Sequence, residues 1–489
     1  MNHDLRWRDY IVMNLYVFGI SFATGSITPL LLPYLVALFV PDADKNTYLA
    51  TVRVVSLAVA MLVQPLAGLL SDRSPHPWGR RRPFIVGATL FSVLFLILVG
   101  ASPLLEGSGL DAALRPALGV TVAYVALLLG IVLLQASTNV GQAAVQGLIP
   151  DLVPERQRGR ASGIKAVMEL LPAFPIIAVG WLVGNDQVGL TVALIVAVFV
   201  VTMLVTVLGV REEPLARRPE GGIRDHVLRL VALTIIFVAT TRAGVWLVSN
   251  SGRLLAGLGA GVGVQVVVVG LAGLLGMAGS ILIGVYLGAR VGIGRGESGQ
   301  GSFIWWVINR LLFLAAVGSI QGFALYYLRD VLQLADAEQW TSVLLAFVAI
   351  FLVTSALGGG VLSDRLGRKR LVALSGLVAA GGTFLLLLAD GLPLVIVSGS
   401  IIGLGTGTFM ASNWALGTEL APPAEAGRYL GIANLAGAGA GIVGAGIGGP
   451  LADFLNQVEP GLGYLVIFAL YGGLFLLSVL SLVKVDSGY

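Results

Sequence analysis

The sequence predicts an all-α membrane protein that crosses the bilayer about fourteen times. Of its 489 residues, 57% are hydrophobic and only 11% are charged, whereas soluble proteins carry roughly 25% charged residues. Apolar runs of ~20 residues, the length that spans the hydrocarbon core, recur along almost the whole chain. Glycine is also abundant, with 66 residues, as expected for helices that pack closely through small side chains.

Each apolar run is predicted to form one transmembrane helix. The first run follows a short basic tail, but it is much longer than the apolar core of a signal peptide, so we expect an uncleaved span. The predicted spans are residues 10–40, 51–70, 83–105, 117–149, 161–183, 189–210, 227–248, 261–288, 303–328, 341–362, 371–389, 393–416, 429–452 and 463–483.

Basic residues gather on one side of the predicted membrane. With a cytoplasmic N-terminus, 23 of the 28 Lys and Arg residues in loops or near the span ends are assigned to the cytoplasmic side. The positive-inside rule therefore predicts a multi-pass protein of the cell membrane with both termini in the cytoplasm. The five basic residues assigned to outside loops are Lys45, Arg53, Arg115, Arg253 and Arg329.

Two motifs occur twice, which predicts a repeat of six spans. The stretch Asp151-Leu-Val-Pro154, followed by Gly159-Arg160, matches Glu419-Leu-Ala-Pro422, followed by Gly427-Arg428. The other motif contains Gly68, Asp72, Arg73, Gly79 and Arg80 after the second span, and its copy contains Asp364, Arg365, Gly367 and Arg368 after the tenth span.

Two repeats of six leave two spans over, at residues 227–248 and 261–288. We expect an N-terminal six-helix bundle at residues 1–210, a charged linker with the inserted helix pair at 211–302, and a C-terminal six-helix bundle at 303–489. An even insertion keeps the orientation of the second half. If one inserted run were re-entrant instead, the basic motif at 365–370 would lie outside, against the positive-inside rule.

The duplicated motif, with Gly68-Leu-Leu-Ser-Asp72-Arg73 and Gly79-Arg80-Arg81-Arg82 in its first copy, resembles the signature of the major facilitator superfamily. The long spacer and the Arg-Arg-Arg-Pro-Phe ending are similar to those of the sucrose and maltose proton symporters, within the glycoside-pentoside-hexuronide group. The resemblance covers the twelve core spans and implies two six-helix bundles that transport by alternating access. It does not cover the inserted pair.

The motif is interpreted as a cytoplasmic gate. Asp72 ends a helix, where it can pair with arginines or approach a helix N-terminus. Arg80 to Arg82 anchor the next helix on the cytoplasmic side. The plainer interpretation is a topology signal, but such a signal needs only basic residues and not an acid in both copies.

The fourth predicted span carries four amides at helical spacing: Gln135, Asn139, Gln142 and Gln146. At ~100° per residue they share one face. This amide stripe needs partners in the membrane. It either holds helices together or lines a cavity where amides bind sugar hydroxyls, which we favour.

Proton coupling has one candidate group at membrane depth. The symporters that this chain resembles typically carry an aspartate where this chain has Gln135, which cannot exchange a proton. Only Glu169 of the acidic residues lies well inside a predicted span. It is either a structural ion-pair partner of Lys165, one turn away, or a displaced proton carrier or sugar ligand.

Further candidate binding residues lie on the ninth and twelfth spans. Arg310 is too deep to be an ordinary loop charge. Its side chain either extends toward the cytoplasmic surface or pairs with Glu169 or with a substrate. Asn309 is its neighbour in the sequence. Trp306 and Trp414 could stack under a sugar ring, although tryptophan is also common in membrane helices, and Asn413 precedes Trp414. Arg242, in the inserted pair, has no obvious partner.

Other classes of function are disfavoured. The chain has no cysteine and three histidines in or beside polar segments, so we expect no metal, no cofactor and no enzymatic activity. The small net charge argues against nucleic-acid binding. We predict a monomeric secondary transporter of a sugar or glycoside coupled to protons, with the lipid bilayer as its surroundings. The alternative is a facilitator or exporter of a non-sugar amphipathic solute.

Overall fold

The computed structural model describes residues 5–212, 224–292, 300–420 and 426–486. Fourteen helical segments within this part are long and apolar enough to cross a membrane, which confirms the predicted fold class. Some helix ends differ from the predicted ends of the spans. The largest difference at a helix start is in the second span, where helix α3 begins at Lys45 instead of residue 51.

The helices are ordered as follows. In the first half of the chain they are α1 (Trp7–Ser26), α2 (Leu32–Phe39), α3 (Lys45–Asp72), α4 (Arg82–Ala101), α5 (Gly109–Leu118), α6 (Val122–Leu152), α7 (Arg158–Leu170), α8 (Ile176–Gly184) and α9 (Val188–Gly209). In the second half they are α10 (Arg224–Gly257), α11 (Val262–Gly292), α12 (Gln300–Tyr326), α13 (Ala337–Leu366), α14 (Arg368–Leu386), α15 (Leu392–Leu420), α16 (Ala426–Val458) and α17 (Leu462–Ser481).

Two of the spans are interrupted near prolines. Between α1 and α2 the chain forms a π-helical segment, Ile27–Leu31, around Pro29. Between α7 and α8 it forms a 3-10 turn, Leu171–Ala173, which contains Pro172. Proline removes a backbone donor and crowds the preceding turn, so a helix adjusts locally at these positions.

The chain divides into two compact units. The first comprises residues 1–40 and 59–228, and the second comprises residues 41–58 and 229–489. This division differs from the predicted domain boundaries at 210 and 302. The inserted pair belongs to the second unit from residue 229 on, and so does the start of α3 up to residue 58. Within the first unit α4 packs on α6 and α1 packs on α9.

In the second unit, small residues allow close helix contacts. Gly403 and Gly407 of α15 lie against backbone carbonyl groups of Val348 and Leu352 on α13, where any Cβ would overlap them. Gly444 of α16 packs in the same way on Ala315 of α12. Close backbone approach of this kind is how membrane helices gain packing without a hydrophobic driving force.

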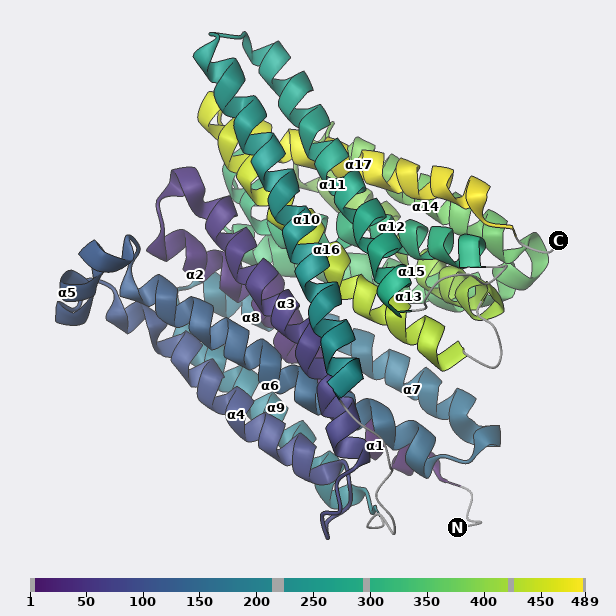
Figure 1. The fold of residues 1–489 in the computed structure, drawn as a ribbon. Helices are drawn as coiled ribbons and strands as arrows, with labels where there is room; N and C mark the ends of the chain where they lie inside the picture. The colour runs from purple at the N-terminus through teal and green to yellow at the C-terminus, as the bar shows by residue number, and fades with distance from the viewer. Residues whose placement is uncertain (1–4, 213–223, 293–299, 421–425, 487–489) are drawn as a thin grey trace. The chain divides into compact units, whose positions relative to one another are not determined.

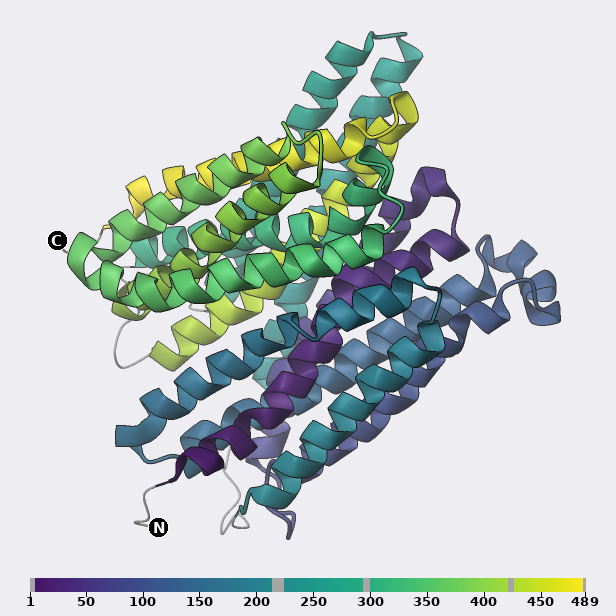
Figure 2. The same ribbon diagram turned by 180° about the vertical axis from the view of Figure 1, so that it is seen from behind.

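The inserted pair forms a helical hairpin. Helices α10 and α11 run side by side in both views (Figures 1 and 2), and Ser280 on α11 donates a hydrogen bond of 2.8 Å to the backbone oxygen of Thr240 on α10. Helix α11 also packs on α16. The hairpin is thus an integral part of the second unit.

Candidate functional site

Polar side chains of α12, α15 and α17 form one hydrogen-bonded chain in the second unit. Nη1 of Arg310 donates to Oδ1 of Asn413 at 3.1 Å, and Nδ2 of Asn413 donates to Oδ1 of Asn309 at 2.8 Å. Nδ2 of Asn309 donates to the backbone O and the Oγ of Ser478, each at 2.8 Å. We call this group the Arg310 cluster; its members are Trp306, Asn309, Arg310, Asn413, Trp414 and Ser478.

The two tryptophans of the cluster have different surroundings. Trp306 is fully buried, its Nε1 donates to the backbone oxygen of Asn413 at 2.9 Å, and its ring packs against Gly417. Trp414 is 36% exposed, and its ring centroid lies 5.2 Å from Cζ of Arg310. Of the two rings predicted to stack under a sugar, only Trp414 is partly open in this structure.

Arg310 lacks a carboxylate partner among the residues that the structure describes. None of the ion pairs found there includes it. Its Nε is buried and has no hydrogen-bond partner in the described part of the chain. Because an unpaired charge at membrane depth is costly, this cation is the most unusual feature of the cluster.

The predicted amide stripe lies on α6, in the first unit. Asn139 is buried, and its Nδ2 donates back to the backbone oxygen of Gln135 at 2.8 Å. Gln135 and Gln142 are half-buried and Gln146 is exposed. Within the described chain no hydrogen bond engages the side-chain amides of these three glutamines, so they are available to bind other groups.

Glu169 is the acid of an ion pair on α7. Nζ of Lys165 lies 2.9 Å from Oε1 of Glu169, and the side chains are 26% and 41% exposed. The pair spans one helical turn and therefore forms without help from another helix. This is the structural arrangement that the spacing of the two residues predicts.

The first copy of the duplicated motif is closed by ion pairs. The two arginines Arg80 and Arg81 both bind Asp151 at the end of α6, with Nε to Oδ2 distances of 3.0 and 2.9 Å. Arg81 also binds Asp72 and Ser71. Glu212, which follows α9, accepts hydrogen bonds from the backbone N–H groups of Arg81 and Arg82 at 2.9–3.2 Å. We call this group the first latch.

Electrostatics and a glycine shape the first latch. Burial raises the pKa of the Glu212 carboxyl, and hydrogen bonds from the backbone of Arg82 and Arg81 offset part of that rise. Gly79 has a φ of +106° and lies against Glu212, where any side chain would collide with the carboxylate. Glycine is therefore required there for two independent reasons.

The second copy of the motif makes fewer contacts. Nη1 of Arg368 binds Oε2 of Glu419 at 3.0 Å, and Nζ of Lys369 donates to the backbone oxygen of Val485 at 2.6 Å. We call these residues the second latch. Gly367 has a φ of +87°, and Arg365 is exposed. The side chain of Asp364 lies outside the described residues.

Sequence reasoning missed some of the partners in these latches. Asp151 and Glu419 occupy matching positions in one duplicated motif. Each pairs with an arginine of the other duplicated motif, Arg80 after Gly79 and Arg368 after Gly367. That shared register is a signal from which the pairing could have been predicted. Glu212 gave no such signal, because it is one charge among many in the linker.

A second polar group in the second unit was also missed. Lys45 binds Asp42 at 3.0 Å and Asp330 at 2.6 Å. Asp453 accepts hydrogen bonds from the Nδ2 of Asn46 and from the backbone N–H groups of Asn46 and Thr47, at 2.6–3.1 Å. Tyr464 donates to Asp330 at 2.7 Å and accepts from Asn46 at 3.2 Å. We call these seven residues the Lys45 network: Asp42, Lys45, Asn46, Thr47, Asp330, Asp453 and Tyr464.

The prediction that Lys45 and Arg53 lie in an outside loop was wrong. Both belong to α3 and are buried, with exposures of 4% and 8%. Nη2 of Arg53 donates to the backbone oxygen of Gly318 at 2.9 Å, and its Nη1 packs against Gly322. Helix α3 extends to Lys45 because Asp453, a residue more than 400 positions away, satisfies its first N–H groups.

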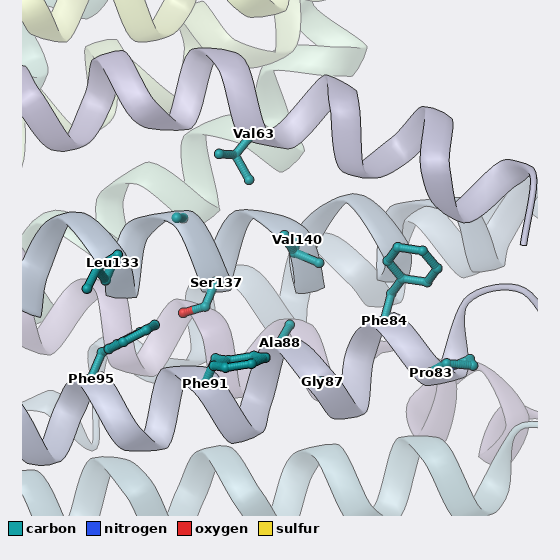
Figure 3. A pocket seen from close by; sticks show the side chains of 11 residues that line it. Val63, Pro83, Phe84, Gly87, Ala88, Phe91, Phe95, Leu133, Ser137 and Val140 are labelled. Carbon is teal, nitrogen blue, oxygen red and sulfur yellow. The ribbon is translucent and has the colours of Figure 1, made fainter. Parts of the chain in front are cut away.

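The first unit also contains an open hollow of about 450 Å³ between α3, α4 and α6. Phe84, Phe91 and Phe95 of α4 face Leu133 and Val140 of α6 across it (Figure 3). Among the described residues that line it, Ser137 alone has a polar side chain, which is hydrogen-bonded to Ser92 at 2.7 Å. The hollow is apolar and does not include the amide stripe.

The sequence profile of the Major Facilitator Superfamily matches residues 13–331 and 310–488. The chain belongs to this superfamily. The resemblance carried by the duplicated motif is thereby confirmed.

Curated relatives match only parts of the chain. A sucrose transport protein of Arabidopsis thaliana is 31% identical over 142 residues, covering 29% of this chain and 26% of that protein. The general alpha-glucoside permease of Schizosaccharomyces pombe is 31% identical over 164 residues, covering 31% and 28%. Solute carrier family 45 member 4 of Homo sapiens is 30% identical over 188 residues, covering 36% and 22%. The match thus spans about a quarter of each relative.

Solved structures share the fold over nearly the whole chain. A D-xylose-proton symporter aligns with a TM-score of 0.63 at 15% identity and covers 98% of this chain and 97% of its own. A peptide transporter of the POT family in complex with alafosfalin gives 0.66 at 16%, with 97% and 93% covered. A nucleoside transporter gives 0.63 at 13%, with 98% and 100% covered. Since their substrates differ, this fold leaves the solute open.

Proposed function

We propose that this protein is a secondary transporter of a sugar or glycoside in the cell membrane, that it acts as a monomer, and that it works by alternating access. The Arg310 cluster is the observation that carries the proposal. It gathers a guanidinium group, two amides and a partly open indole ring within membrane-spanning helices. Sugars are bound by polar side chains that match their hydroxyls and by aromatic rings that cover their apolar faces.

The amide stripe of α6 complements this chemistry. A glutamine amide both donates and accepts hydrogen bonds, and each sugar hydroxyl does the same. The side-chain amides of Gln135, Gln142 and Gln146 have no hydrogen-bond partner among the described residues, so a hydroxylated solute would satisfy them. The sucrose and alpha-glucoside transporters among the relatives support the same class of solute.

We assign the two latches to the cytoplasmic side, where the positive-inside rule places their arginines. Each latch ties the start of one helix to the end of another within its own unit, through Arg80 and Asp151 in the first and Arg368 and Glu419 in the second. The latches would keep each bundle rigid while the substrate site changes its access. This division of rigid bundles around a midplane site is typical of secondary transporters.

For the coupling ion we propose a proton carried by Glu169. Its side chain is 41% exposed, lies within a membrane-spanning segment and pairs with Nζ of Lys165 at 2.9 Å. Glu169→Gln should abolish accumulation driven by a pH gradient while sparing exchange of solute. Glu106→Gln, a change at an exposed acid, is the control. Full accumulation by the Glu169 variant would rule out this role.

Uptake by purified protein in liposomes tests the proposal as a whole. Labelled mono- and disaccharides are offered with and without an imposed pH gradient. We expect saturable uptake of at least one sugar and accumulation only with the gradient. Saturable uptake that ignores the gradient would make the protein a facilitator, and a lack of uptake for every sugar would contradict the assignment of substrate.

A further inference from the structure

We propose that the inserted hairpin is a docking surface for another membrane protein, and that Arg242 of α10 pairs there with a carboxylate on a membrane-spanning helix of that partner. The proposal rests on the depth of Arg242, on its exposure, and on the lack of a counter-charge for it in the described chain. It concerns a contact away from the Arg310 cluster and does not depend on which solute is carried.

Arg242 lies at the centre of its membrane-spanning segment. This segment is Val227–Gly257, so Arg242 is fifteen residues from either end, or about 22 Å along the helix axis. Gly244, two residues further on, packs against Gly276 of α11, which is fourteen residues from either end of its own segment, Val262–Arg290. Both helices therefore place Arg242 near the midplane, roughly 15 Å from either surface of the hydrocarbon core.

Arg242 lies on the face of α10 that the rest of the chain leaves uncovered. The opposite face is buried in the second unit, where Thr241 and Val248 are only 3% and 1% exposed. Arg242 is exposed, and Trp246, one turn further on, is 66% exposed. At the midplane of a bilayer, such a face contacts either lipid chains or another protein.

No group of the described chain compensates Arg242. It takes part in none of the hydrogen bonds or ion pairs found there. The phosphates of lipids lie at the membrane surface, farther away than an arginine side chain extends. Because an arginine exposed to hydrocarbon is costly, charged side chains at this depth usually pair with one another. The missing charge is therefore expected on another membrane-spanning helix.

The partner is expected to be a different protein and not a second copy of this chain. Among the described membrane-spanning segments, Glu169 is the only acid that lies more than five residues from an end. It already pairs with Lys165 of its own helix, at 2.9 Å. A second copy would have to break this pair in order to supply a carboxylate to Arg242.

The surface around Arg242 suits close approach of a helix. Ala239 and Ala243 are both exposed and lie four residues apart, on either side of Arg242 in the sequence. Small residues at this spacing allow the backbones of two membrane helices to come close together. Arginine and carboxylate would then form two parallel hydrogen bonds. The larger side chains of Ile235 and Trp246, 61% and 66% exposed, lie at the two ends of this surface.

Two synthetic helices that differ in one group test the proposal. Each is a membrane-spanning polyleucine helix of about 20 residues, with glutamate at its centre in one peptide and glutamine in the other. The chain has no cysteine, so Leu258→Cys, at a 72% exposed position of the hairpin, provides a single site for a donor dye. Energy transfer to acceptor-labelled peptide in phosphatidylcholine vesicles then measures binding to the full-length protein.

We expect the glutamate helix to bind at least about tenfold more tightly than the glutamine helix, the size of effect that a charged hydrogen bond gives. Equal affinities, or no binding of either helix, would overturn the proposal. Since this first comparison keeps Arg242, its outcome does not depend on whether a variant at that position folds.

Variants connect the preference to Arg242. In Arg242→Gln the ratio of the two affinities should fall to near one, whereas Arg242→Lys, which keeps a charge but loses the paired donors, should keep part of it. Arg253→Gln, at an exposed arginine near the end of the same helix, should leave the ratio unchanged. A preference for glutamate that survives in Arg242→Gln would contradict the assignment to this residue.

Discussion

The Lys45 network and the Arg310 cluster are both buried polar groups of the second unit, but they differ in charge balance. In the Lys45 network every charged group has compensation: Lys45 has Asp42 and Asp330, and Asp453 binds N–H groups at the start of α3. A helix N-terminus carries partial positive charge, which favours a carboxylate there. In the Arg310 cluster the cation contacts one amide and one indole ring among the described residues, and no carboxylate there pairs with it.

Under the proposed function, this difference separates groups that hold the fold from groups that bind the solute. A balanced network stabilises the folded chain, and removal of one member leaves another unpaired. An unbalanced cation lowers stability until a ligand supplies the missing charge. Substitutions in the Lys45 network should therefore lower the free energy of unfolding. Substitutions in the Arg310 cluster should lower the uptake of solute.

The largest expected effect on stability is that of Asp453→Ala. It leaves Asn46 and the first N–H groups of α3 without their acceptor in a buried site, which costs roughly 3 kcal/mol. Equilibrium unfolding of the purified protein in detergent measures the loss. Glu459→Ala, at an exposed acid just beyond α16, should change the free energy of unfolding by less than about 0.5 kcal/mol. Equal effects of the two variants would contradict the role given to the network.

Arg310→Gln should have the opposite effect to Asp453→Ala: uptake should fall while the free energy of unfolding does not. Removal of an uncompensated cation should leave the free energy of unfolding unchanged or raise it by about 1 kcal/mol, while uptake of the transported solute falls at least about tenfold through the loss of a charged hydrogen bond. Unfolding and liposome uptake are measured on the same preparation. A variant that unfolds as easily as Asp453→Ala would show that Arg310 is a structural group.

The two latches allow a smaller comparison of the same kind. Asp151 binds two arginines and its side chain is 13% exposed, whereas Glu419 binds one and is 32% exposed. We expect Asp151→Asn to lower the free energy of unfolding by roughly 2 kcal/mol and Glu419→Gln by less than about 1 kcal/mol, the usual size for a more exposed pair. The reverse order in unfolding experiments would refute this ranking.

The smallest effect concerns pH and Glu212. Burial raises the pKa of this carboxyl, so its stabilising contribution is complete below its unfolded pKa and is lost as the pH rises through the folded value. The thermal stability of the wild-type protein relative to Glu212→Gln should thus be highest near pH ~4 and decline toward neutral pH. The same comparison with Glu155→Gln, where the side chain is 89% exposed, should show no such trend. A wild-type advantage that grows with pH would contradict the assigned direction.

The membrane class, the fourteen spans and the duplicated motif could all be predicted from sequence, because hydropathy, length and repetition are properties of local segments. Trp306, Asn309, Arg310, Asn413 and Trp414 were also predicted as candidates, since polar and aromatic residues inside apolar runs are conspicuous. Their roles in binding a solute remain predictions.

The failures have a common physical cause. Lys45 and Arg53 were assigned to a loop because a charge usually ends an apolar run, yet distant residues compensate or surround both of them: Asp330 for Lys45, and Gly318 and Gly322 for Arg53. The burial of Trp306, whose role stays a prediction, also depends on a residue of another helix, Gly417. None of these partners is adjacent in the chain.

By itself the sequence determined the class of protein, its spans and its repeated motifs, since these follow from the free energy of placing each segment in lipid. Only the tertiary structure decided which charges are compensated. Compensation depends on distances of a few ångströms between residues that lie tens to hundreds of positions apart, and in a medium of low polarity those distances decide whether a charged side chain is paired or left without a counter-charge.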